Sequence, residues 1–190
     1  MPSTQAIGAD EIRGESPDKE RSSICRKACE YIRRADALQG FGLPGDIDRV
    51  AHTIILDSNV VLDWLFFRDV RLAALADEVT AGRCRWVVSA AMRLELEHVL
   101  TRPNWQSRQF DIAQLWMQWD RWACPVNPPA VVPTNPLRCT DPDDQKFLDL
   151  ACHVGASALL SRDRAVLKLA RRAMPLGLRI CTPENWSPPA

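Results

Sequence analysis

The chain has 190 residues, with 24 basic and 24 acidic side chains, so its formal net charge is zero. A chain of this length is expected to form one main domain, with room for a terminal extension. The balanced charge excludes a global attraction to nucleic acid or to membranes, so any basic surface must be local. No segment approaches the roughly 18 consecutive apolar residues of a transmembrane helix, and no membrane association is expected.

The seven cysteines are an odd set without a compact spacing repeat, and the first 23 residues do not resemble a signal peptide. We therefore expect reduced thiols in a cytoplasmic protein. Cys25 and Cys29 have the spacing of half a zinc site, but no second pair or nearby His completes it.

Residues 1–50 are predicted to form an N-terminal appendage outside the core domain, which takes up residues 51–190. Residues 1–22 hold almost no large apolar side chains, so they cannot bury enough surface to order themselves. Residues 23–39 carry a weak helical pattern, and the glycines and proline of residues 40–45 then break the chain.

From Thr53 onward, strand and helix patterns alternate. Strands are predicted over 53–57, 85–89, 157–160 and 178–181, with a short edge strand beside the proline-rich loop 125–136. Helices are predicted over 60–67, 69–82, 90–101, 109–123, 143–154 and 164–172. This alternation predicts an α/β fold with three α/β/α layers and a parallel, Rossmann-like central sheet.

The helix predicted over 109–123 is rich in tryptophan. Trp116, Trp119 and Trp122 recur every three residues, so they drift around one side of the helix. The ordinary interpretation is core packing together with an edge that faces a partner. The alternative is a platform on which nucleic-acid bases stack.

Acidic residues recur where the predicted strands end. Asp57 follows the first strand, Asp163 follows the strand 157–160, and Asp144 opens a helix. Glu95 lies within the helix that follows the second strand. Because parallel strands end at one edge of a sheet, where open α/β folds bind their ligands, these acids are expected to gather there.

Each acid also has a purely structural explanation, as a helix cap, as a complement to the helix dipole, or as a solvent-exposed side chain. Taken together, clustered carboxylates repel one another and destabilise the fold unless a cation compensates for them. Oxygen ligands of this kind suit hard divalent cations, and such sites most often serve phosphoryl transfer.

Other reaction classes lack their motifs. The chain has no glycine-rich phosphate loop with a Walker lysine, no Gly-x-Ser-x-Gly elbow, and only three histidines. Asp57-Ser58-Asn59 also lacks the Asp-x-Asp pair of haloacid-type phosphatases, and a receiver domain carries its phospho-acceptor on a middle strand.

Five segments carry a family resemblance, and they are Leu56-Asp57-Ser58-Asn59, residues 89–103 around Glu95, residues 141–151 around Asp144, Leu160-Ser-Arg-Asp163 and Thr182-Pro-Glu184. In this order and spacing they resemble the PIN domain over about residues 52–187. The resemblance is greatest to the branch described as toxin components of toxin–antitoxin systems.

The resemblance implies a Mg²⁺- or Mn²⁺-dependent ribonuclease that cleaves single-stranded RNA. Its catalytic and metal-binding acids would be Asp57, Glu95, Asp144 and Asp163, supported by Ser58, Asn59 and Ser161. It also implies a homodimer and a separate antitoxin protein that occludes the site. The competing interpretation is a PIN-like module that binds RNA or protein without cleaving.

Two assignments stay open in the sequence. Glu97 is the alternative to Glu95, and because two residues turn a helix by roughly 200°, both cannot face the site. Arg162, Arg164 and Lys168 lie near enough in sequence to contact phosphates, but they can equally form a solvated helix face.

Overall fold

The computed structural model describes residues 52–102, 111–127 and 135–188. It contains a five-stranded sheet in the order β3-β2-β1-β4-β5, in which every pairing is parallel. The strands are β1 (His52–Leu56), β2 (Cys84–Val88), β3 (Ala123–Pro125), β4 (Ala158–Leu160) and β5 (Arg179–Cys181). The parallel α/β/α fold is confirmed, whereas the predicted appendage 1–50 lies outside the described residues.

The centre of the sheet is buried on both faces. Ile54, Ile55 and Leu56 of β1 have no exposed surface, and neither has Leu160 of β4. A central parallel strand needs apolar side chains on both faces because helices cover both, which explains the continuous apolar run of β1. The register pairs Ile54 with Trp86 of β2 and Leu56 with Leu160.

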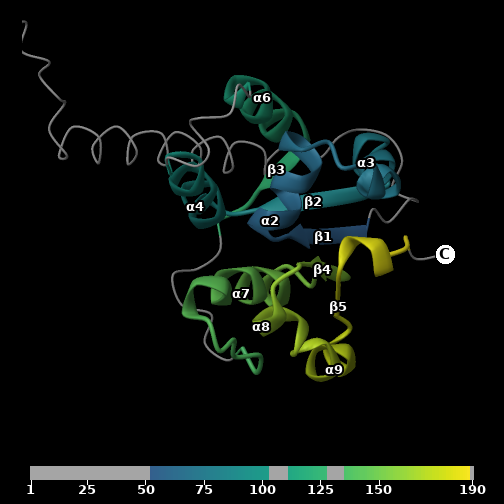
Figure 1. Cartoon of the computed structure of the whole chain (residues 1–190). Coiled ribbons are helices and arrows are strands. Elements are labelled where there is room, and N and C mark those ends of the chain that lie inside the picture. Colours follow the sequence, from purple (N-terminus) through teal and green to yellow (C-terminus); the bar gives the residue numbers. More distant parts are fainter. Residues whose placement is uncertain (1–51, 103–110, 128–134, 189–190) are drawn as a thin grey trace, which may run out of the picture.

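Helices and short helical turns surround the sheet, with α3 and α6 beside β2 and β3, and α7, α8 and α9 beside β4 and β5 (Figure 1). The α-helices are α2 (Ser58–Val61), α3 (Ala73–Thr80), α4 (Ala90–Leu100), α6 (Ile112–Trp122), α7 (Gln145–His153), α8 (Arg164–Leu167) and α9 (Ala170–Ala173). The other turns are η1 (Leu62–Phe66), η2 (Val70–Leu72), η3 (Pro142–Asp144), η4 (Met174–Leu176) and η5 (Pro183–Asn185). No described helix is long and apolar enough to cross a membrane.

Several helix boundaries differ from their predictions. The helix predicted over 60–67 begins earlier, at Ser58, and finishes in the π-helical turn η1. The helix predicted over 164–172 is divided into α8 and α9, because the amide of Leu169 bonds the carbonyl of Val166 in a tighter turn. Ser89 caps α4 by accepting a hydrogen bond from the Met92 amide, at 3.4 Å.

The tryptophans of α6 divide between two environments. Trp119 is buried, and its ring meets that of Trp86 edge to face at a centroid distance of 4.8 Å. Trp116 and Trp122 are half-buried, and the guanidinium groups of Arg93 and Arg121 lie over their rings at 4.4 and 4.6 Å. Core packing therefore accounts for Trp119, and the two outer rings hold cations on their faces.

Candidate functional site

The strand order reverses between β1 and β4. From β1 the chain moves outward to β2 and β3, and it then returns to the other side of β1 as β4 and β5. Open α/β sheets bind ligands at such a switch point, beyond the carboxyl ends of the strands. Strands β1 and β4 end at the same level, since Leu56 pairs with Leu160. The Asp57 amide donates a 3.0 Å hydrogen bond to the Leu160 carbonyl. Asp57 and Ser161 therefore emerge side by side at this point.

Asp57 is almost completely buried, with 3% of its surface exposed. Its Oδ2 accepts hydrogen bonds from Ser161 Oγ at 2.5 Å and from Asn59 Nδ2 at 2.8 Å. Burial raises the pKa of Asp57, the Ser161 hydrogen bond opposes that rise, and the charge of Glu95 adds to it. The side chain makes no capping bond to α2, so capping does not explain an acid here.

Asn59 and Ser161 link the two strand ends further. Asn59 Oδ1 accepts a 3.3 Å hydrogen bond from the Arg162 amide, and Ser161 Oγ accepts one of 2.9 Å from the Asp163 amide. These bonds hold Asp57 and the loop between β4 and α8 in one polar network. Ser58 follows Asp57 in the sequence and is buried at the start of α2. Its side chain makes none of the hydrogen bonds described above.

Asp144 ends the turn η3 and carries a clear electrostatic perturbation. Desolvation, followed by the charges of Asp57 and Asp163, raises its pKa to about 7. Its Oδ2 is buried and has no hydrogen-bond partner among the described residues. Asp141, by contrast, caps η3 through the Asp143 amide at 2.9 Å. The structural explanation therefore applies to Asp141, and Asp144 is left with an unsatisfied oxygen.

Asp163 is both a helix cap and a member of the acidic cluster. Its Oδ1 caps α8 by accepting a 2.6 Å hydrogen bond from the Ala165 amide. Its charge also contributes to the raised pKa of Asp144, so the two carboxylates lie within electrostatic range of each other. One oxygen thus orders the helix while the carboxylate as a whole belongs to the acidic cluster.

Glu95 and Glu97 face different neighbours. Glu97 lies 3.3 Å from Arg93, which also pairs with Asp120 of α6 at 2.7 Å. Glu95 instead has its Oε2 2.7 Å from Nζ of Lys146 on α7, and its charge raises the pKa of Asp57. The geometry therefore directs Glu95, and not Glu97, toward the acidic cluster.

The three predicted phosphate contacts are placed differently from one another. Arg162 is held between two carboxylates, with Nε 2.6 Å from Asp63 and Nη2 2.6 Å from Glu184. Arg164 and Lys168 are exposed on and just after α8. The guanidinium of Arg162 is therefore already occupied, whereas the other two cations face solvent.

Sequence reasoning missed the residues that support Asp144. Gln145 donates to the Leu137 carbonyl at 3.0 Å and accepts from the Cys139 amide at 2.8 Å. The side chain of the buried Asn135 donates to Asp149 at 2.7 Å. Together these bonds fix the loop that leads into η3. The sequence shows only that polar residues open an amphipathic helix, which does not reveal partners in a preceding loop.

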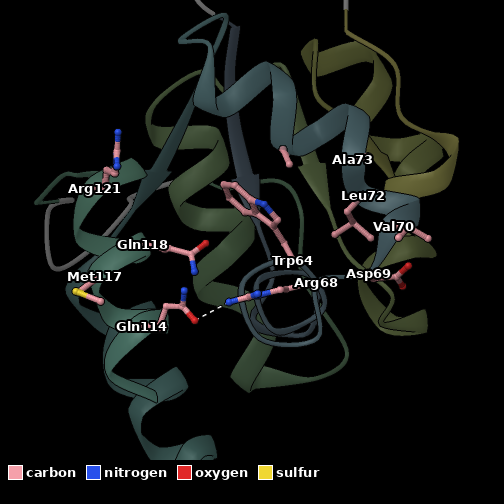
Figure 2. Close-up of a pocket in the computed structure, with 11 residues that line it drawn as sticks. Trp64, Arg68, Asp69, Val70, Leu72, Ala73, Gln114, Met117, Gln118 and Arg121 are labelled. Atoms are coloured by element: carbon pink, nitrogen blue, oxygen red, sulfur yellow. Dashed lines mark hydrogen bonds between the residues drawn. The ribbon is translucent and has the colours of Figure 1, made fainter. Parts of the chain in front are cut away.

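A cavity of about 690 Å³ lies away from these acids, between the η1–α3 segment and α6. Figure 2 shows Trp64 between Gln118 and Met117 of α6 on one side and Leu72 and Ala73 on the other. Arg68 reaches across to Gln114 with a 2.6 Å hydrogen bond. None of the four acids lines this cavity, so it is separate from the acidic site.

The acids of the site do not form a preassembled metal-binding group among the described residues. As the side chains stand, the described residues contain no group of three or more His, Cys, Asp or Glu placed to hold a metal ion. Nevertheless, the buried Oδ2 of Asp144 accepts no hydrogen bond, and the buried Oε2 of Glu95 is paired with the Lys146 ammonium. Desolvation and then neighbouring carboxylates raise the pKa of Asp144. Mg²⁺ binds through one or two carboxylates and keeps several waters, so these oxygens fit such an ion.

A family model described as PIN domain matches residues 53–165, which is more than half of the 190-residue chain. No curated protein matches the chain. The matched region runs from β1 to the beginning of α8 and contains all four acids at the switch point. The chain therefore belongs to the PIN domain family, whose members commonly have nuclease activity and typically use divalent metals.

Proposed function

We propose that this protein is a metal-dependent endoribonuclease that cleaves single-stranded RNA. Its catalytic and metal-binding residues are Asp57, Glu95, Asp144 and Asp163. The observation that carries the proposal is the state of Asp144, whose buried Oδ2 lacks a partner, while desolvation and then the charges of Asp57 and Asp163 raise its pKa to about 7. A divalent cation would compensate for this repulsion, which is the ordinary reason to gather acids in one place.

The residues of the site divide the work between them. Ser161 and Asn59 hold one oxygen of Asp57, which leaves its other oxygen for a ligand. Asp144 offers a buried oxygen without a hydrogen bond, and Glu95 offers a buried oxygen that is paired with the Lys146 ammonium. A bound Mg²⁺ or Mn²⁺ ion would supply an activated water and neutralise charge on the leaving oxygen.

Substrate contacts are expected to be local because the chain as a whole is neutral. Arg164 and Lys168 are exposed close to Asp163 in the sequence, where they can meet RNA phosphates. Arg162, held by Asp63 and Glu184, orders the loop of the site in this proposal and does not contact RNA.

The biological role that we propose is that of the toxin of a type II toxin–antitoxin pair in the cytoplasm. The resemblance of the acid-bearing segments to the toxin branch of the family supports it. In this role a separate small antitoxin protein occludes the site, and the toxin is a homodimer. Met117 of α6 is 65% exposed and offers apolar surface for an interface.

The second candidate is a PIN-like module that binds RNA or protein without cleaving. One observation favours it, because no group of three or more metal-ligating side chains stands ready among the described residues. In that case the acids would serve only the fold, for example as helix caps and hydrogen-bond acceptors.

The nuclease and the binding module are distinguished by incubating the full-length protein with mixed-sequence single-stranded RNA, in Mn²⁺ or in EDTA. Asp57→Asn and Asp144→Asn are compared with Asp143→Asn, an exposed neighbour in the same turn. Cleavage that needs Mn²⁺, survives Asp143→Asn and disappears in the other two variants would support the nuclease. RNA binding without cleavage would favour the module, and cleavage in all three variants would exclude the assigned acids.

A further inference from the structure

Lys146 is the second residue of α7, and its ammonium lies inside the acidic site. Nζ is 2.7 Å from Oε2 of Glu95 and also donates to the Asp143 carbonyl. The same ammonium is 5.0 Å from the ring centroid of Phe147. Three neighbours therefore restrain a side chain that ordinarily extends into water, and only 24% of it is exposed.

The contact between Lys146 and Glu95 is a close ion pair. Oε2 of Glu95 is buried, and the ammonium lies 2.7 Å from it. A cation that binds this oxygen must therefore displace the ammonium. The charge of Lys146 also lowers the pKa of Asp144, against the larger effects that raise it.

We propose that Lys146 is the internal counterion of the acidic site, and that it occupies Glu95 until a divalent cation takes its place. This inference rests on the proposed function, in which Glu95 is a metal ligand. The ammonium and a divalent cation carry the same sign and need the same oxygen, so both cannot remain against Glu95. Lys146 is thus a positioning residue that holds Glu95 toward the site and competes with the metal.

Metal affinity tests this inference without any need for catalysis. Mn²⁺ is titrated calorimetrically into the full-length protein, into Lys146→Met and into Lys146→Arg at fixed ionic strength. Lys146→Met removes the competing charge, and Mn²⁺ affinity is expected to rise about tenfold, as for loss of one nearby charge at a partly exposed site. Lys146→Arg keeps the charge and is expected to stay near the wild-type affinity.

Two controls isolate the pair. Arg171→Met removes one positive charge from an exposed position on α9 and should leave Mn²⁺ affinity unchanged. In a Glu95→Gln background, Lys146→Met should alter Mn²⁺ affinity by less than about twofold, because the shared oxygen is no longer charged. Circular dichroism verifies that each variant folds, and Lys146→Gln replaces Lys146→Met if the latter does not.

The outcomes are distinct. Unchanged or weaker Mn²⁺ binding by Lys146→Met overturns the counterion role, and if Asp144→Asn still abolishes binding, the proposed function stands without it. If neither the wild type nor Lys146→Met binds Mn²⁺, the proposed metal site and this inference both fail. Tighter binding that persists in the Glu95→Gln background would show that Lys146 acts on the metal through another residue.

Discussion

Ser161 Oγ donates a 2.5 Å hydrogen bond to Oδ2 of Asp57, across 104 positions of the sequence. Both side chains are buried, at the level carboxyl ends of β1 and β4. The bond therefore sets the orientation of the most buried acid of the site. It also opposes the rise in the pKa of Asp57 that burial causes.

Ser161→Ala is expected to lower cleavage at least tenfold at neutral pH, because Asp57 loses the bond that favours its charged form. The pKa of Asp57 should rise, so the pH profile of kcat/KM should move to higher pH. Ser157→Ala is the matched control, since Ser157 Oγ bonds the Thr53 carbonyl at 3.0 Å at the opposite end of the same two strands. An equal loss of activity in both variants would mean that Ser161 acts only through stability.

The metal-free protein is expected to lose stability as the pH rises. Asp144 has a pKa of about 7 in the fold, against an ordinary value of 3.8, so folding favours its protonated form. This stability is fully present below about pH 4 and is lost as the pH rises through about 7. After allowance for partial exposure, the loss is about 1–2 kcal/mol. Urea titrations in EDTA should show the fall, and Asp144→Asn should flatten it.

Mn²⁺ is expected to raise Tm more at pH 8 than at pH 6. The ion must bind the deprotonated carboxylate, and the pKa of Asp144 near 7 leaves much of that group protonated at the lower pH. Thermal unfolding at both pH values, with and without Mn²⁺, measures the difference. An equal increase at the two pH values, or one that is retained in Asp144→Asn, would place the ion elsewhere.

Glu95→Gln is expected to lower metal-dependent cleavage at least about 100-fold, whereas Glu97→Gln should alter it only a few-fold. The two side chains have the same chemistry but face Lys146 and Arg93, respectively. Initial rates on the same single-stranded RNA compare them directly. The reverse order of effects would transfer the second acid to Glu97.

Arg162→Ala is expected to lower the free energy of unfolding by about 1–3 kcal/mol, because Asp63 and Glu184 both lose their ion pair with Arg162. Cleavage should also fall, since Arg162 lies between Ser161 and Asp163 in the loop of the site. Arg83→Ala breaks an exposed pair with Glu78 and should cost at most about 1 kcal/mol. If Arg162→Ala weakens RNA binding without any loss of stability, Arg162 is a phosphate contact after all.

The sequence by itself determined the parallel α/β fold and the recurrence of acids at strand ends. The buried run Ile54–Leu56 is a local pattern, and parallel strands must end at one edge, so Asp57 and Asp163 could be directed to that edge without coordinates. Helix boundaries were less predictable, as in the division of 164–172 into two helices, because a single tightened turn leaves no mark on apolar spacing.

Only the tertiary structure decided which side chains meet. Glu95 and Glu97 are equivalent in the sequence, but Glu95 pairs with Lys146 of α7, whereas Glu97 pairs with Arg93 of its own helix. Lys146 gained its place in the site from the packing of α7 near α4, and Arg162 from an ion pair with Asp63 across 99 positions. Such pairs depend on distances between elements that lie far apart in the chain, and no periodicity within one element encodes those distances.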